Sequence, residues 1–183
     1  YAQNKGVENI GIDTNEFATD RVCSVVEQIV TLCPTVNIGV GISLDGFQQT
    51  HDNIRMDGSY VRAMDTAQRF CRLREQYKNF SFFFNSTINN VNWRELPELA
   101  DYVHERFQTF LDFNLLTGNP RDTSLTSPDP DDIRSTVDGI YATRKHYSIP
   151  ESLLNTYRDA LMKSHDKGIR FISCRAGSLF VLV

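Results

Sequence analysis

Alternation between strand-like and helix-like segments is the feature that most constrains how this chain can fold. Four segments carry the apolar and β-branched residues typical of strands, and they are residues 7–14, 36–44, 80–88 and 108–116. A helix-like segment separates each of them from the next. Because strands that alternate with helices form parallel sheets with right-handed crossovers, the sequence predicts an α/β fold. The near-continuous apolar start of the third segment predicts a strand that is covered on both faces.

Apolar residues at helical spacing mark the segments between these strands. They are Val22, Val25, Val26, Ile29 and Val30 in the first, Tyr60, Ala63, Met64, Ala67, Phe70 and Cys71 in the second, and Leu96, Leu99, Ala100, Val103 and Phe107 in the third. We expect Pro34 to end the first helix and Ser59 to cap the second. After Gly118 a loop rich in proline and aspartate precedes a helix expected from about Pro130, and a last helix is expected from Pro150.

Composition excludes several classes of function. The 183 residues suffice for about one domain. With 19 Lys and Arg against 23 Asp and Glu, the net charge is −4, so we expect no nucleic-acid partner. No apolar run approaches the roughly 20 residues that cross a bilayer, so we expect no membrane partner. The four cysteines, at positions 23, 33, 71 and 174, have neither zinc-site nor disulfide-framework spacing, which indicates a reducing, cytoplasmic location.

Both ends of the chain are unusual. It opens on Tyr1, without Met, and stops at an uncharged apolar run, Ser178–Val183. Because natural proteins avoid a free apolar strand of this kind, we expect the chain to be an internal piece of a longer protein.

Polar residues follow each predicted strand. These groups are Thr14–Glu16, Ser43–Gly46, Asn85–Thr87 and Asn114–Leu116. In parallel α/β folds, ligands bind at the carboxyl ends of the strands. A rim of largely neutral hydrogen-bonding groups predicts a site for a polar small molecule, rather than an acid–base pair or a metal cluster.

The most distinctive stretch begins Ile42-Ser-Leu-Asp-Gly-Phe-Gln-Gln-Thr-His51-Asp-Asn-Ile-Arg55 and ends Asp57-Gly-Ser-Tyr60. It resembles the radical S-adenosylmethionine enzymes, whose fourth strand and following loop read S-L-D-G, then H-D-x-x-R, then G-S-[FY]. Thr14-Asn15 resembles the T-N-G that ends the third strand of that family. Cys174-Arg-Ala-Gly177 resembles the C-x-A-G entry to its SPASM extension. The resemblance covers about residues 1–116 and 169–183.

This resemblance implies a parallel (β/α) partial TIM-like barrel of which only the later strands are present. It divides the chain into a partial barrel (1–116), a helical bridge toward a C-terminal cluster domain (117–168) and the start of a SPASM-like extension (169–183). The cofactors implied are S-adenosylmethionine and a [4Fe–4S] cluster, which together generate a 5′-deoxyadenosyl radical that abstracts hydrogen from a substrate. The substrate would be a peptide, a protein or a small molecule, and an electron donor such as flavodoxin or ferredoxin would be a partner.

Individual residues receive roles from the same resemblance. Arg55, expected in a polar loop beyond a strand tip, would pair with the methionine carboxylate of the cofactor, and Ser43 would bond the same polar end or the ribose. Asn15 would lie at the cofactor, and Leu115 would contact its adenine. Cys174 would ligate an auxiliary iron–sulfur cluster. Asp45 is expected to accept backbone N–H bonds within its own turn.

The sequence also departs from the family. The C-x-x-x-C-x-x-C loop that binds the catalytic cluster and the G-G-E-P motif are absent, and we expect both upstream of Tyr1. These 183 residues alone are therefore expected to be a poor catalyst. Glu16 replaces the Gly of T-N-G, a position where Gly is favoured for its free φ.

Two other interpretations remain open from the sequence. One is a different parallel-barrel enzyme, such as an aldolase or a sugar-nucleotide transferase, which should carry a Schiff-base lysine or a metal-binding D-x-D at a strand end. The other is a degenerate, non-catalytic domain that binds a peptide or a partner, for which Glu16 is the best support.

Overall fold

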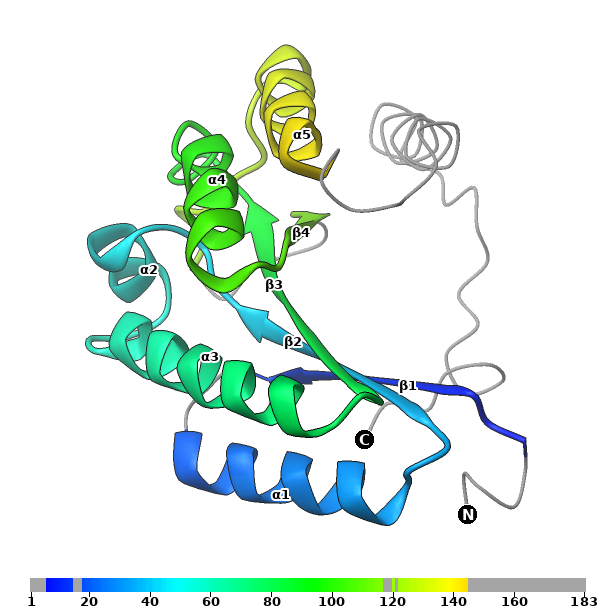
Figure 1. Cartoon of the computed structure of the whole chain (residues 1–183). Helices are drawn as coiled ribbons and strands as arrows, with labels where there is room; N and C mark the ends of the chain where they lie inside the picture. Colours follow the sequence, from blue (N-terminus) through cyan, green and yellow to red (C-terminus); the bar gives the residue numbers. More distant parts are fainter. Residues whose placement is uncertain (1–5, 15–17, 117–119, 121, 145–183) are drawn as a thin grey trace.

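Four parallel strands form one sheet in the computed structural model, which describes residues 6–14, 18–116, 120 and 122–144 (Figure 1). The strands are β1 (Asn9–Thr14), β2 (Asn37–Ser43), β3 (Phe80–Ile88) and β4 (Leu111–Leu115). They lie in the order β1-β2-β3-β4, so each strand pairs with its neighbour in the sequence. The register pairs Thr14 with Ile42, and Ser43 with Asn85. The α/β prediction is confirmed, and the arrangement is that of an arc of a (β/α) barrel.

Helices connect the strands and cover one side of the arc (Figure 1). They are α1 (Thr19–Leu32), α2 (Gln48–Ile54), α3 (Ser59–Gln76), α4 (Leu96–Phe107) and α5 (Pro130–Arg144). The bounds of α1, α3 and α4 agree with the predicted helical stripes, and α5 begins at Pro130 as expected. The short helix α2 was not predicted, because its residues 48–54 carry no apolar stripe.

The core lies between the helices and one face of the sheet. Helix-facing side chains of β2, β3 and β4 are buried, and they include Ile38, Val40, Ile42, Phe80, Phe82, Phe84, Leu111 and Phe113. Side chains on the opposite face of β3 alternate with them and are half-buried or exposed. The expectation that β3 is covered on both faces is therefore wrong: its apolar run includes Phe83, which stacks on Phe110 at a centroid distance of 5.5 Å on the less buried face.

Two local expectations are also corrected. The N-cap of α3 is Gly58, with φ of 75°, and not Ser59, which is the first helical residue. Strand β4 is shorter than residues 108–116, because Gln108 adopts a left-handed conformation that ends α4. Thr109 follows as a buried residue of the connection to β4, and its hydroxyl donates to the carbonyl oxygen of Phe82 at 2.6 Å. The helix expected from Pro150 and the SPASM-like segment lie outside the described residues.

Asn79 ties the amino-terminal side of the sheet together. Its side-chain nitrogen lies 3.1–3.3 Å from the carbonyl oxygens of Val30, in the last turn of α1, and of Cys33 and Val36, in the connection to β2. The single amide thus satisfies carbonyls that the end of α1 leaves without helical partners.

We expect Asn79→Ala to lower the free energy of unfolding by about 1–3 kcal/mol, because partly buried carbonyls lose their donor. The neighbouring exposed residue supplies the control: Lys78→Ala should stay within about ±0.5 kcal/mol of wild type. Urea unfolding of both variants measures the difference. Equal stability of the two variants would contradict the role assigned to Asn79.

Candidate functional site

The carboxyl ends of the four strands bring the predicted rim residues to one edge of the sheet. Across this edge the register aligns Ser43 with Asn85, and Asn85 with Asp112. The Ser43 hydroxyl donates to the carbonyl oxygen of Thr14 at 3.1 Å, which links the tips of β1 and β2. The amide of Asn114 donates to Asn85 at 3.2 Å on the other side. The edge is therefore a continuous row of hydrogen-bonding side chains.

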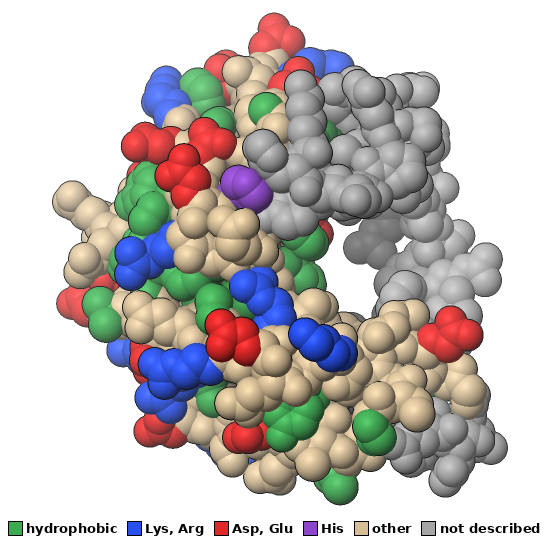
Figure 2. Space-filling view, viewed as in Figure 1, with side chains coloured by type: hydrophobic (Ala, Val, Ile, Leu, Met, Phe, Trp, Pro, Cys, Tyr) green, Lys and Arg blue, Asp and Glu red, His purple; other side chains and the backbone are tan. Residues whose placement is uncertain are grey.

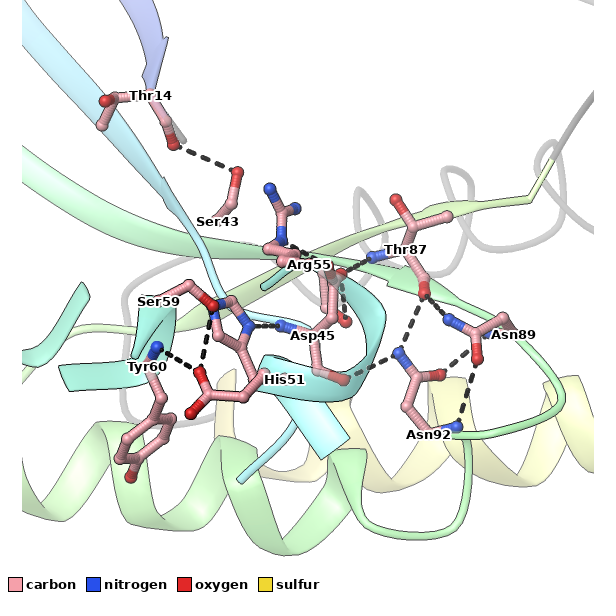
Figure 3. A network of polar contacts seen from close by, with 12 residues as sticks. Thr14, Ser43, Asp45, His51, Arg55, Ser59, Tyr60, Thr87, Asn89 and Asn92 are labelled. Atoms are coloured by element: carbon pink, nitrogen blue, oxygen red, sulfur yellow. Dashed lines mark hydrogen bonds and ion pairs between the residues drawn. The ribbon is translucent and has the colours of Figure 1, made fainter. Parts of the chain in front are cut away.

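Asp45 is the centre of a polar network just beyond β2 (Figure 3). The residue is only 3% exposed. Its Oδ1 accepts the backbone N–H of Thr87 at 2.9 Å and lies 3.4 Å from the Ser86 hydroxyl. Its Oδ2 lies 2.7 Å from the Arg55 Nε. Contrary to the expectation of a bond within its own turn, the carboxylate joins β2 to β3 and to the end of α2.

His51 holds the main chain of the same turn. Its Nδ1 accepts the backbone N–H of Asp45 at 3.0 Å, so the ring is neutral with its proton on Nε2. The ring is fully buried, and its Nε2 has no hydrogen-bond partner among the residues that the structure describes. Burial lowers the pKa of His51 to about 4, although the Asp45 carboxylate acts in the opposite direction. A charged ring could not accept the Asp45 N–H.

Arg55 caps the carboxyl end of α2 rather than lying in an irregular loop. Its Nε bonds Asp45, and 28% of its side chain remains exposed. In the described part of the chain, no hydrogen bond is made by its two terminal nitrogens. Figure 3 shows them pointing away from Asp45, on the side of Ser43. A cationic pair of donors is thus presented near the strand ends.

The loop after β3 closes the other side of the network. The Asn92 side-chain nitrogen donates to the carbonyl oxygens of Asp45 and Thr87, at 2.9 and 3.0 Å. The Asn92 side-chain oxygen accepts the backbone N–H of Asn89 at 2.9 Å. The backbone N–H of Asn90 donates to the carbonyl oxygen of Thr126, and the Asn90 side-chain oxygen accepts the Thr126 N–H, both at 2.9 Å. These bonds bring the residues before α5 to this edge.

The amino ends of α2 and α3 are each capped by an acidic side chain that lies outside the helix it caps. Asp52 accepts the backbone N–H of Tyr60 and the hydroxyl of Ser59, at 2.8 and 3.0 Å, and so caps α3. Its pKa lies below the ordinary value, because these bonds and one from the Gly58 N–H outweigh the opposing effect of desolvation. Glu95 bonds the Thr50 hydroxyl and the Phe47 N–H at the start of α2; burial nevertheless raises its pKa.

The predicted site residues have different outcomes. Ser43 and Arg55 lie at the same edge, and Leu115 ends β4 at that edge, half-buried against the core. Asn15, Glu16 and Cys174 lie outside the described residues. His51, Asn92 and Glu95 also belong to the site, and they were not predicted from the sequence. The polar H-D of His51-Asp52 and the Asn-rich run 89–92 were the available signals.

Other surfaces of the molecule differ from this edge. A groove of about 340 Å³ lies between α1 and α3, on the helical side of the sheet, and its lining includes Asp20, Glu27, Arg69 and Arg72. Figure 2 shows acidic and basic side chains intermixed on the face that carries these helices.

Among the described residues, no three His, Cys, Asp or Glu side chains are grouped to hold a metal ion. None of the described helices has the length and apolar character needed to span a membrane.

Comparison with known proteins gives one structural likeness. No protein-family model and no curated protein matches the sequence. A solved domain of pyruvate-formate lyase-activating enzyme from Bacteroides vulgatus ATCC 8482 is similar in structure, with a TM-score of 0.50 and 13% sequence identity. The match covers 77% of this chain and 80% of that chain. At this identity the likeness concerns the fold.

We expect the buried His51 to make the protein less stable in mild acid. Because its pKa is lowered from 6.5 to about 4, the unfolded chain binds more protons between these values, so stability rises with pH across this window. The loss on going from pH 7 to pH 4 should be on the order of 3 kcal/mol. Urea unfolding at a series of pH values measures it.

The matched variant is His51→Asn, whose amide oxygen can accept the Asp45 N–H but does not titrate. The slope of stability against pH between 4 and 6.5 should flatten in this variant. A slope as steep as that of wild type would show that other groups cause the acid sensitivity.

Gly46 is expected to tolerate no side chain. Its φ is 154°, and a Cβ there would collide with the Glu95 carboxylate and with Thr50, at 2.8 Å. We expect Gly46→Ala to lower the free energy of unfolding by about 2 kcal/mol or more, since both backbone strain and overpacking arise. Gly11→Ala, where a Cβ meets no described atom within 4 Å, should change the free energy of unfolding by less than about 1 kcal/mol. Thermal or urea unfolding of the Gly46→Ala and Gly11→Ala variants measures both changes, and equal stability of the two variants would contradict the prediction.

Proposed function

We propose that this chain is the core of a radical S-adenosylmethionine enzyme and that the strand-end edge binds the cofactor. The parallel arc of strands supports this proposal, and so does its likeness to a domain of an activating enzyme from that family. When bound, the cofactor supplies a 5′-deoxyadenosyl radical for hydrogen abstraction from a substrate, and the protein's part is to bind and orient it.

The observation that carries the proposal is the pair of terminal nitrogens on Arg55 near Ser43, which make no hydrogen bond to any residue that the structure describes. The guanidinium is partly exposed and holds Asp45 only through Nε. A guanidinium with both terminal nitrogens available forms two parallel charge-assisted bonds to a carboxylate. The methionine end of S-adenosylmethionine offers such a carboxylate.

The remaining residues fit the rest of the cofactor. Ser43 would bond the polar methionine end or the ribose from the tip of β2. Leu115, half-buried at the tip of β4, would contact the adenine through apolar surface and backbone. Asn15 would complete the contact from the β1 side.

The described residues do not fit an iron–sulfur cluster. The described cysteines, Cys23, Cys33 and Cys71, are free and lie on or beside α1 and α3, away from the strand-end edge. We therefore propose that the ligands of the catalytic cluster come from outside these 183 residues, and that Cys174 ligates an auxiliary cluster. An electron donor such as flavodoxin or ferredoxin would reduce the enzyme in the cytoplasm. The substrate would be a peptide or a small molecule.

An aldolase is less well supported by the same geometry. Lys78 precedes β3, at the amino end of the strand, where a Schiff base would be remote from the site. The D-x-D candidate, Asp129 and Asp131, flanks Pro130, the first residue of α5, and so lies beyond β4, the last described strand. A non-catalytic binding domain predicts that cofactor binding fails, which the following experiment tests.

We expect Arg55→Lys to weaken binding of S-adenosylmethionine by about tenfold and Arg55→Ala by about 10- to 100-fold. Lysine keeps a positive charge beside Asp45, so it preserves the fold better, but it lacks the two-pronged contact. The measurement is calorimetric titration of the complete, cluster-loaded protein. Arg69→Lys is the matched control, because Arg69 is ion-paired with Asp20 and Asp65 on the outer helices.

If both Arg55 variants bind S-adenosylmethionine within about twofold of the wild-type affinity, Arg55 does not bind the cofactor. The reaction itself is tested by supplying dithionite to the same protein and measuring 5′-deoxyadenosine. If the wild-type protein neither binds S-adenosylmethionine nor forms 5′-deoxyadenosine, the proposed function is wrong.

A further inference from the structure

Asp45 is fixed in place by every polar group that it has. Its backbone N–H bonds His51, and its backbone oxygen accepts from Asn92. Its Oδ1 is held by the Thr87 N–H of the neighbouring strand. With the side chain 4% exposed, this carboxylate has no freedom to follow a moving partner.

Arg55 depends on that carboxylate for its orientation. The 2.7 Å contact between Nε and Oδ2 uses one of the five N–H donors of the guanidinium. The other four are on Nη1 and Nη2, and they make no hydrogen bond within the described residues. Because a guanidinium is planar and rigid, fixing Nε fixes the direction in which both terminal nitrogens point.

We propose that Asp45 is a positioning residue, which holds Arg55 through Nε so that Nη1 and Nη2 face a ligand carboxylate as two parallel donors. The inference rests on the proposed function, and it assigns to Asp45 a part in cofactor affinity. The arginine loses its rotamer freedom on folding rather than on binding, so less entropy is lost when the ligand arrives.

A purely electrostatic account of Asp45 makes the opposite prediction. A buried negative charge beside an anion-binding arginine repels the anion, so its removal should strengthen binding. The positioning account says that removal weakens binding, since the guanidinium becomes mobile. The sign of the change in affinity therefore separates the two.

The experiment is calorimetric titration of S-adenosylmethionine into the complete, cluster-loaded protein and its Asp45→Asn variant. Asparagine has the shape of aspartate and can still accept the Thr87 N–H, but it cannot pair with Arg55. We expect affinity to fall about five- to tenfold. Unchanged or tighter binding by Asp45→Asn overturns the proposal.

The matched control is Asp52→Asn, which removes a negative charge from α2, the helix that ends at Arg55. Asp52 caps α3 and bonds Ser59 and Tyr60, not Arg55. This variant should be less stable in urea while its affinity stays within about twofold of wild type. An equal loss of affinity in both variants would mean that general loosening of the loop, rather than Arg55, is responsible, and would overturn the proposal.

A double-mutant cycle shows whether Asp45 acts through Arg55. If it does, Asp45→Asn causes no further loss of affinity once Arg55 is alanine, because the group that it positions is gone. Losses that add in the double variant assign Asp45 a separate, structural effect and contradict the proposal.

A second readout needs no cofactor. In 15N-labelled protein the Arg55 Nε–H signal, assigned by its absence from Arg55→Lys, should be protected from exchange in wild type and broadened in Asp45→Asn. An unchanged signal overturns the positioning of Arg55 whether or not S-adenosylmethionine binds. If the signal responds but wild type does not bind S-adenosylmethionine, the positioning stands and the proposed function fails.

Discussion

One buried carboxylate organises the carboxyl edge of this sheet. Asp45 follows β2, but its bonds reach β3, the end of α2 and the loop before α4. A buried carboxylate is costly unless each oxygen has a partner, so these contacts must form together. The position of Arg55, the turn at Gly46 and the course of residues 89–92 all depend on that requirement.

The strands and long helices could be predicted because their pattern is local. Ile38, Val40 and Ile42 alternate with small residues along β2, and the stripes of α1, α3 and α4 repeat at helical spacing. Helix α2 could not be found this way. All of its seven residues except Ile54 are polar, and its amino end is bonded by Glu95, which is more than forty residues away in the sequence. The stabilising partner becomes visible only when α4 is placed beside it.

The site was predicted in outline for the same reason. Residues that follow strands fall on one edge of a parallel sheet, which places Ser43 and Arg55 together from the sequence alone. Their chemistry depends on pairings that spacing does not reveal. Asp45 and Arg55 are ten residues apart, and only the intervening helix turns one toward the other. The neutral state of His51 likewise depends on burial, which a sequence does not display.

The sequential strand order has a consequence for how the chain acquires its structure during synthesis. Each strand pairs with the one made just before it, so every new strand emerges to find its partner present and loop closures stay short. All the bonding partners of Asp45 lie between residues 51 and 92. The network is therefore complete before β4 leaves the ribosome, and β4 is added to an edge whose polar groups are already in order.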